Sequence, residues 1–288
     1  MSEYLLVGGN GFLSGHIKHW ISVLDKSTSI CETQRDLQGQ NSLRLQLDLA
    51  GDLCSWPEFP AGLKSVFIGA AITSQAEVAA DLARSKLVNV DRTLLLARTL
   101  LGSGAHIVFP STNLVLPCNE PQQAETTALR PNGTYAEQKA AVENSLMDVG
   151  GKVAVCRLPK VLSTATPLIA KWVDMLRAKG RIEAFDDLYI SPVSGAYASR
   201  VLALIMVGQA SGVFQVASRE DLSYYELALA IASKLGVSSA LVRPVSVQTL
   251  GGSLQSQGRY PSMSGQNVEK TFGVLPQSLD ELLDELLT

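Results

Sequence analysis

Short apolar runs alternate with amphipathic stretches over the first half of this chain. Segments of strand length stand at 4–7, 29–34, 43–49, 65–68, 106–109 and 152–158, and the segment at 43–49 alternates apolar and polar residues through most of its length. Between them, apolar residues recur at helical spacing, for example from Phe12 to Leu24 and from Glu77 to about Leu101. Strands that alternate with helices in this way form a parallel sheet covered by helices on both faces. The pattern therefore predicts an α/β fold with a Rossmann-type, doubly wound parallel sheet.

The pattern changes after Pro159 to a mixture of helices and strands, with helices expected at about 168–179 and 199–209 and a strand at 213–216. Ser223 and Ser278 each stand three residues before a glutamate, which predicts capping boxes at two helix starts. We expect a dinucleotide-binding domain over 1–160 and a smaller mixed α/β substrate-binding lobe over 161–288, with boundaries that can interleave. The stretch 251–258, rich in Gly, Ser and Gln, predicts a mobile loop and a candidate lid.

Composition narrows the class of protein. With 288 residues, 46% of them apolar, the chain can bury a full core. A net charge of −3 leaves no excess of cations for a nucleic-acid backbone, so nucleic acid is not an expected partner. The cysteines form no Cys-x-x-Cys pair and His16, His19 and His106 lack metal-ligand spacing, so we expect no metal. We expect no signal peptide and no membrane span, which needs ~18 apolar residues, and hence a cytoplasmic protein.

A glycine-rich turn follows the first apolar run. Gly8 is placed to turn the chain at the end of the strand, and Gly11 is placed to let a pyrophosphate approach the N-terminus of the next helix. The third glycine of the usual Gly-x-x-Gly-x-x-Gly is Ser14 here, so the helix must pack with a small hydroxyl at that point. The turn predicts a dinucleotide site.

A threonine, a tyrosine and a lysine follow one another along the chain in an arrangement that suits the reduction of a carbonyl group. Tyr135 and Lys139 stand four apart on a predicted helix and therefore share one face, and Thr112 follows the fifth strand. A tyrosine can protonate a developing alkoxide, a nearby ammonium is expected to lower the pKa of that tyrosine, and the threonine hydroxyl can position the substrate oxygen. Thr112, Tyr135 and Lys139 are therefore the candidate catalytic residues.

The ordered set of motifs resembles the extended short-chain dehydrogenase/reductase superfamily. Within it, the chain is most similar to the dTDP-4-dehydrorhamnose reductase-like and nucleotide-sugar epimerase/dehydratase group. The resemblance covers almost the whole chain and rests on Gly8-Gly9-Asn10-Gly11-Phe12-Leu13, Gly69-Ala70-Ala71, Asn89-Val90-Asp91, Ser111-Thr112, Tyr135-Ala136-Glu137-Gln138-Lys139 and Arg157.

The resemblance implies roles for particular residues. Tyr135 would be the acid/base, Lys139 would bind the nicotinamide ribose, and Thr112 would be the hydroxyl partner. The cofactor would be bound by Gly8, Asn10, Gly11, Phe12, Leu13, Arg35, Asp48, Leu49, Ala70, Ala71, Asn89, Lys139, Leu158 and Pro159. The substrate, a small molecule of the nucleotide-sugar type, would be bound by Thr73, Thr112, Asn113, Tyr135 and Arg259. A homodimer is also implied, with the helices of Asn89 and Tyr135 pairing across a two-fold axis.

Three functions agree with this resemblance. The dehydratases of the group carry an Asp-Glu pair after the threonine, where this chain has Asn113 and Leu114, so elimination lacks its acid and base. We therefore expect an NAD(P)-dependent oxidoreductase that reduces the keto group of a nucleotide-linked sugar. A nucleotide-sugar 4-epimerase and a catalytically idle NAD(P)-binding sensor or scaffold are the alternatives.

The choice of cofactor depends on the register of the second strand. If the strand follows its helix without insertion, Glu32 takes the acidic position that binds the ribose 2′-hydroxyl, which indicates NAD. If Ile30 is instead the first strand residue, Thr33-x-Arg35 resembles the ending found in NADP-using relatives. Thr28 and Ser29 are poor strand residues, and Arg35 suits a phosphate, so we favour the second register and NADP, with NAD as the alternative.

Overall fold

The computed structural model describes residues 3–26, 28–36, 43–247 and 258–287. The predicted lid, 251–258, lies outside the described residues except for Gly258. The chain forms two compact units that interleave along the sequence. The first comprises 1–115, 129–157 and 198–214, and the second comprises 116–128, 158–197 and 215–288.

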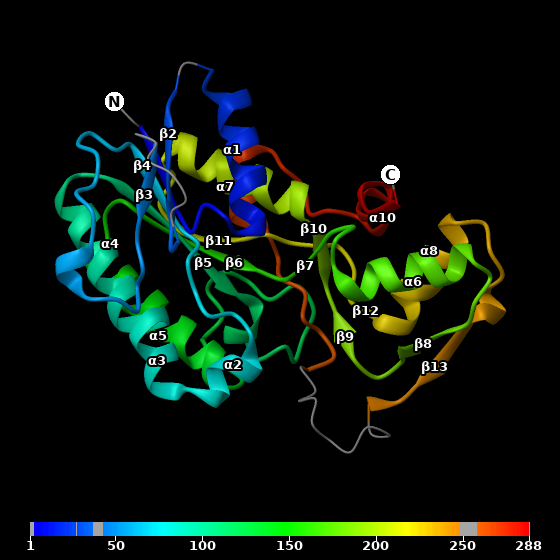
Figure 1. The fold of residues 1–288 in the computed structure, drawn as a ribbon. Helices are drawn as coiled ribbons and strands as arrows, with labels where there is room; N and C mark the ends of the chain where they lie inside the picture. Colours follow the sequence, from blue (N-terminus) through cyan, green and yellow to red (C-terminus); the bar gives the residue numbers. More distant parts are fainter. Residues whose placement is uncertain (1–2, 27, 37–42, 248–257, 288) are drawn as a thin grey trace. The chain divides into compact units, whose positions relative to one another are not determined.

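The first unit is built on a seven-stranded sheet in the order β11-β6-β5-β4-β1-β2-β3 (Figure 1). The pairs β1–β2, β1–β4, β2–β3 and β4–β5 are parallel. The strands are β1 (Tyr4–Val7), β2 (Ile30–Gln34), β3 (Arg44–Gln46), β4 (Ser65–Ile68), β5 (His106–Thr112), β6 (Val153–Leu158) and β11 (Gly212–Gln215). This order reverses direction at β1, as a doubly wound sheet does, and the predicted fold class is confirmed.

Helices cover both faces of this sheet (Figure 1). On one face lie α1 (Phe12–Leu24) and α7 (Gly195–Gly208), where Ser199 donates a hydrogen bond to Leu13 O. On the other face lie α4 (Thr93–Gly102) and α5 (Thr134–Val149). An apolar cluster that includes Ile107, Phe109 and Leu146 joins the sheet to α4 and α5. β1 and β4 are buried along their whole length, which explains why 4–7 and 66–68 are continuous apolar runs.

The single helix predicted from Glu77 to about Leu101 is wrong. The structure has α2 (Gln75–Ala80), α3 (Leu82–Lys86), a π-helical turn η2 (Leu87–Arg92) and then α4. The Asp81 carboxylate accepts a hydrogen bond from Arg84 N and starts a new helix. In the π turn, the Thr93 hydroxyl donates to Val88 O, five residues back. Because a π turn and a cap leave the apolar spacing almost unchanged, the pattern alone does not reveal them.

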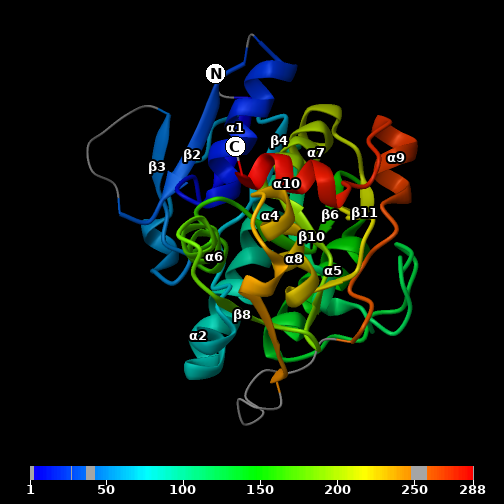
Figure 2. The ribbon, with the colours of Figure 1, turned by 90° about the vertical axis from the view of Figure 1, so that its right-hand side faces the viewer.

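The second unit combines small strand pairs with helices. Its strands are β7 (Lys160–Leu162), β8 (Ile182–Phe185), β9 (Tyr189–Ile190), β10 (Pro192–Ser194), β12 (Leu222–Ser223) and β13 (Val242–Val245). Its main helices are α6 (Pro167–Arg177), α8 (Tyr224–Lys234), α9 (Gln266–Phe272) and α10 (Leu279–Leu287). Figure 2 shows α10 beside α8, and both contribute to an apolar core with α6. The predicted capping boxes at Ser223 and Ser278 are both present.

The remaining short elements of the described residues are 3-10 turns. They are η1 (Leu53–Ser55), η3 (Asn113–Val115) and η4 (Ser239–Leu241). Two strand predictions need correction: β3 is shorter than the predicted 43–49, and β5 continues beyond 109 to Thr112, so Ser111 and Thr112 belong to the strand. A search of the described helices finds none with the length and apolar character needed to span a membrane.

Candidate dinucleotide and catalytic site

The glycine turn brings two backbones into close approach. Gly8 has a φ of +88°, and a Cβ added there would lie 3.0 Å from Ala70 N, in the segment after β4. Gly11 N donates to Gly8 O at 2.9 Å, and Gly11 is the N-cap residue of α1. Glycine at position 8 therefore meets two demands, a left-handed conformation and contact with a second backbone. No side chain among the described residues caps the start of α1, so its first amides are left for a bound anion.

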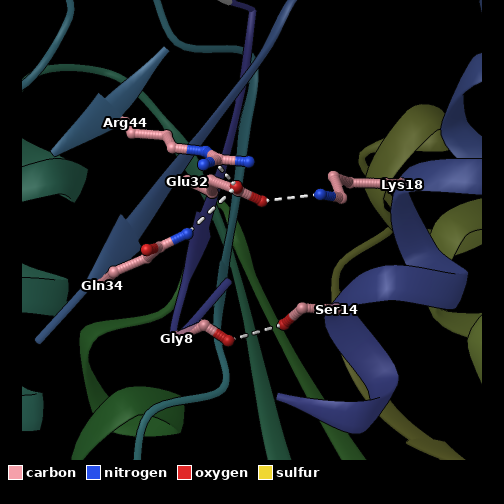
Figure 3. Close-up of polar contacts among 6 residues, drawn as sticks. All are labelled: Gly8, Ser14, Lys18, Glu32, Gln34 and Arg44. Carbon is pink, nitrogen blue, oxygen red and sulfur yellow. Dashed lines mark hydrogen bonds and ion pairs between the residues drawn. The ribbon is translucent and has the colours of Figure 1, made fainter. Parts of the chain in front are cut away.

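Ser14 fits where a glycine is usual. It is buried, and its hydroxyl donates a hydrogen bond to Gly8 O at 2.9 Å (Figure 3). The hydroxyl thereby satisfies a turn carbonyl and ties the first turn of α1 to the glycine turn. The expected tolerance for a small hydroxyl at this position is confirmed.

A cavity of about 380 Å³ lies at the glycine turn, at the carboxyl ends of the first unit's strands. That size is within the range of small-molecule sites. Among the predicted cofactor residues, it is lined by Gly8, Asn10, Gly11, Arg35, Asp48, Leu49, Ala70 and Ala71. It is also lined by residues that the sequence analysis did not select, namely Thr33, Gln34, Asp36, Leu47, Ala50, Gly69, Ile72, Arg84 and Val88.

Several other predicted cofactor residues lie elsewhere. Phe12 and Leu13 form the first turn of α1, where the Phe12 ring is 46% exposed and packs edge-on against His16. Asn89 is buried in the π turn; its side chain accepts from Ile72 N, donates to Ile72 O and donates to Gln138 Oε1. Asn89 thus holds the backbone of a cavity-lining residue. Leu158 and Pro159 are buried residues of the second unit.

The second strand begins at Ile30, in the register that we favour. Val7 of β1 pairs with Thr33 of β2. Gln34 is the last residue of β2, and Arg35 follows it. Glu32 is 5% exposed and does not line the cavity. Its carboxylate accepts from Lys18 Nζ at 2.8 Å and from Arg44 Nε at 3.0 Å (Figure 3). The acid that would indicate NAD is therefore engaged by two cations.

Tyr135 and Lys139 lie one turn apart at the start of α5. Lys139 is buried, and its Nζ donates a hydrogen bond to Pro110 O of β5 at 2.8 Å. The same nitrogen lies 4.5 Å from the centroid of the Phe109 ring and 5.8 Å from that of the Tyr135 ring. The Lys139 ammonium therefore lies between the Tyr135 ring and the end of β5. This agrees with the prediction that Tyr135 and Lys139 share one face of their helix.

The prediction that Lys139 lowers the pKa of Tyr135 is wrong. Burial raises the pKa of the Tyr135 hydroxyl to about 12, and no charge among the described residues offsets it. Burial also lowers the pKa of Lys139 to about 8, against the opposing influence of Glu143. Loss of contact with water is the largest cause of both pKa shifts, because it disfavours the charged form of each group. Tyr135 is thus a protonated phenol at neutral pH.

The hydroxyls at the end of β5 differ in their partners. The Thr112 hydroxyl accepts from Leu114 N at 3.2 Å and donates to Asn113 Oδ1 at 3.5 Å. Buried Ser111 has no hydrogen-bond partner for its Oγ among the described residues. Thr73 is an exposed residue of the segment between β4 and α2. Ser111 is a site residue candidate that the sequence analysis did not select, although its place beside Thr112 is a signal for it.

The second unit holds Arg259 and a larger cavity. The exposed Arg259 guanidinium lies 5.3 Å from the Tyr189 ring centroid and 5.9 Å from that of Tyr260. The cavity, of about 790 Å³, is formed by α6, β8, β13 and the start of α8. It is lined by Trp172, Tyr224, Phe185, Leu168, Met175, Ile182, Ala184, Leu188 and Val245 and by the charged residues Lys171, Arg181, Glu183 and Arg243. The sequence analysis missed it because its walls come from distant segments; the only local signal is the helical spacing of 168, 171, 172 and 175.

The histidines have ordinary surroundings. His16 and His19 are exposed, whereas His106 is buried between the Ser65 hydroxyl and Ala210 O, at 3.0 and 2.9 Å. Burial lowers the pKa of His106. Within the part of the chain that the structure describes, no three metal-ligating side chains come together.

Fold and site together define a Rossmann-type α/β protein with a cavity at its glycine turn and, one turn apart on α5, a partly buried Tyr135 and a buried Lys139. The family model described as the RmlD substrate binding domain matches residues 2–288, and the chain belongs to that family. The resemblance drawn from the motifs is thereby confirmed.

Solved structures share the fold across nearly the whole chain. A dTDP-4-dehydrorhamnose reductase from Bacillus anthracis str. Ames, in complex with NADP, has a TM-score of 0.80 at 19% identity, covering 99% of this chain and 98% of that one. MoeE5 in complex with UDP-glucuronic acid and NAD has a TM-score of 0.77 at 16% identity, covering 99% and 97%. At these identities the likeness establishes the fold.

Curated relatives match a shorter part of the chain. Methionine adenosyltransferase 2 subunit beta of Xenopus laevis is 22% identical over 191 residues, which cover 62% of this chain and 55% of the relative. The Xenopus tropicalis protein of the same name is 20% identical over 177 residues, 58% and 53% of the two chains. This chain thus spans about half the length of the curated relatives it matches.

Proposed function

We propose that this protein is an NAD(P)-dependent oxidoreductase that reduces the keto group of a nucleotide-linked sugar, with Tyr135 as proton donor. The observation that carries the proposal is the pairing of a partly buried, protonated Tyr135 with the buried Lys139 on α5, in the same unit as the glycine-turn cavity. Both the family and the names of the structural neighbours support it.

The cavity at the glycine turn fits a dinucleotide. Glycine at position 8 allows the contact with Ala70 N, and α1 presents its free amides beside the cavity. When bound, NAD(P)H supplies the hydride for the carbonyl carbon. Gly8, Gly11 and Asn10 would hold its pyrophosphate, Asp48 and Leu49 would border its adenine, and Ala70 and Ala71 would lie along it. Lys139 would bind the ribose next to the nicotinamide.

The protonation state of Tyr135 supports reduction. With a pKa of about 12, its phenol carries the proton that the alkoxide needs after hydride addition. Thr112, at the end of β5, would donate a hydrogen bond to the same oxygen. A 4-epimerase would use the same tyrosine first as a base and then as an acid, and it is the alternative reaction of this site. Dehydration is disfavoured because Asn113 and Leu114 replace the two acids.

The second unit supports a nucleotide-linked substrate. Its cavity combines aromatic and aliphatic walls with Lys171, Arg181 and Arg243, against the single carboxylate Glu183. Apolar walls suit a nucleobase, and the excess of cations suits a diphosphate. Arg259, stacked over two tyrosine rings, is a further cation of this unit. MoeE5, a structural neighbour, was crystallised with UDP-glucuronic acid, which is a compound of this class.

The end of β2 supports NADP as the preferred cofactor. Arg35 lines the cavity directly after the strand, and the Glu32 carboxylate is engaged by Lys18 and Arg44. A guanidinium attracts a 2′-phosphate, although Arg35 Nε also contacts Asp36 Oδ2 at 3.4 Å and Asp36 lines the same cavity. The Bacillus anthracis neighbour was crystallised with NADP.

A second candidate is a regulatory NAD(P)-binding subunit without turnover. The observation that favours it is that the curated relatives are named as a subunit of another enzyme, methionine adenosyltransferase. Such a protein would need the glycine-turn cavity and would not need Tyr135.

We also propose a cytoplasmic homodimer. Exposed apolar side chains on α4 and α5, Leu95 at 39% and Met147 at 38%, support the pairing of these helices that the family resemblance implies. Light scattering at micromolar protein tests it: a dimer mass is expected, and a monomer mass would refute it.

The function is tested with purified protein, NADPH and a panel of dTDP-, UDP- and GDP-4-keto sugars, followed by the absorbance of the reduced cofactor. We expect consumption with at least one sugar and its loss in Tyr135→Phe. NADPH binding without turnover on any sugar would favour the regulatory subunit.

A further inference from the structure

A series of buried hydrogen bonds links the glycine-turn cavity to the helix of Tyr135. It starts at Ile72, which lines the cavity in the segment between β4 and α2. The Asn89 side chain accepts from Ile72 N at 2.8 Å and donates to Ile72 O at 2.9 Å. Asn89 Nδ2 also donates to Gln138 Oε1 of α5 at 2.8 Å, and Gln138 Nε2 donates to Ser85 Oγ of α3 at 3.0 Å. We call this series, from Ile72 to Ser85, the amide bridge.

The side chains of the amide bridge can each be turned only one way. Ile72 N is a donor and requires Asn89 Oδ1, so Asn89 Nδ2 donates to both Ile72 O and Gln138. Gln138 must therefore turn its oxygen toward Asn89 and its nitrogen toward Ser85. The Ser85 hydroxyl accepts from that nitrogen and donates to Leu82 O at 3.2 Å. The backbone of the cavity thus sets the direction of the whole bridge.

Gln138 belongs to the part of α5 that carries the candidate catalytic pair. It stands directly before Lys139 and three residues after Tyr135. It is buried and does not line the cavity. α5 also packs against the π turn that carries Asn89, and such turns are frequent at functional sites. The amide bridge therefore ties the helical turn of Tyr135 and Lys139 to the cavity backbone at Ile72.

We propose that Gln138 is a positioning residue of the candidate site, which acts through Asn89 to hold the cavity backbone and the Tyr135–Lys139 turn of α5 in one arrangement. This inference rests on the proposed function, in which the cofactor lies along the cavity and Tyr135 protonates the product. Its physical reason is geometric: a misplacement of about 1 Å between reacting groups costs about a hundredfold in rate. An apolar side chain at 138 would leave the amide of Asn89 and the hydroxyl of Ser85 without this common partner.

The bridge is tested without cofactor by hydrogen exchange of the Ile72 amide, followed by NMR, in wild type, Gln138→Met and Ser65→Ala. Gln138→Met keeps a long unbranched side chain and removes both hydrogen bonds. Ser65 is the matched control, because it is also buried in the first unit and its hydroxyl bonds with His106 at 3.0 Å instead. We expect Ile72 to exchange about three- to tenfold faster in Gln138→Met, the effect of one lost hydrogen bond on local opening. A rise no larger than that in Ser65→Ala overturns the proposal.

The effect on the reaction is tested with a sugar that wild type reduces. Turnover is expressed per bound NADPH, with the stoichiometry taken from calorimetry, so that unfolded protein does not lower the rate. Gln138→Met should lower kcat about tenfold or more through misplacement of the reacting groups. Its Kd for NADPH should stay within about threefold of wild type, since Gln138 does not line the cavity. Ser65→Ala should keep kcat within about twofold, and an unchanged kcat in Gln138→Met overturns the positioning role.

A second variant covers the case in which Gln138→Met does not fold, as judged by circular dichroism. Ser85→Ala removes only the last partner of Gln138, and the same two comparisons with Ser65→Ala then decide the proposal. A wild type that binds NADPH and reduces no sugar overturns the proposed function. In that case the exchange of Ile72 still decides whether Gln138 holds the cavity backbone, because it is measured without cofactor or substrate.

Discussion

The buried ion pair between Glu143 and Arg157 should be the most sensitive polar contact of the first unit. Glu143 lies on α5, one turn beyond Lys139, and Arg157 lies on β6; their side chains are 2% and 4% exposed. Arg157 donates to Glu143 Oε2 through Nη2 at 2.9 Å and through Nε at 3.1 Å. Glu143→Gln keeps the shape and leaves a buried guanidinium without its counter-ion.

Breaking one partner of a buried pair costs ~3–5 kcal/mol, because the remaining charge stays out of water without compensation. Against a typical stability of about 5–15 kcal/mol, this is a large loss. Urea unfolding followed by circular dichroism measures it as a lower free energy of unfolding. The double variant Glu143→Leu with Arg157→Met removes both charges and should recover most of the loss.

The matched control is an exposed pair of the same residue types. Glu183 and Arg243 lie 3.5 Å apart with side chains 62% and 74% exposed. Glu183→Gln should change the unfolding free energy far less, because solvent screens the exposed pair. If Glu143→Gln costs no more than Glu183→Gln, the assignment of an electrostatic role to the buried pair is refuted.

Three further predictions concern the site. Tyr135→Phe should keep NADPH affinity and lose about a hundredfold or more in turnover, since general acid catalysis contributes on that scale; near wild-type turnover would refute the mechanism. Arg35→Ala should weaken NADPH about tenfold and leave NADH nearly unchanged in calorimetry, since a charge-assisted bond to the phosphate is lost; equal losses for both cofactors would contradict it. Because the pKa of Lys139 is about 8 in the fold and 10.5 is its ordinary value, the unfolded chain binds this proton more tightly. The unfolding free energy of wild type relative to Lys139→Met should therefore rise with pH between about 8 and 10.5, and a flat difference would show that burial does not depress this pKa.

Local patterns predicted the fold because the sheet's strands are buried on both faces. Short apolar runs such as 106–109 that alternate with helical stretches are typical of the buried strands of a parallel sheet. The same reasoning failed over 77–101, since the Asp81 cap and the π turn at Asn89 change the backbone without interrupting the apolar spacing. The direction of the Tyr135 pKa shift could not be predicted from the sequence either. Helical spacing shows that Lys139 is a neighbour of Tyr135, but it does not show that burial raises the pKa of Tyr135 by more than this ammonium lowers it.

Glu32 shows most clearly why a strand-end acid is ambiguous in a sequence. Its role depends on Lys18, fourteen residues before it, and on Arg44, twelve residues after it, neither of which has any pattern that links it to position 32. Only the register that sets Arg44 opposite Glu32, together with α1 crossing the same face, brings both cations to one carboxylate. An acid so engaged keeps its charge, and because the glycine turn packs against it, it does not line the cavity. The residues of this strand end that do line the cavity are Thr33, Gln34, Arg35 and Asp36.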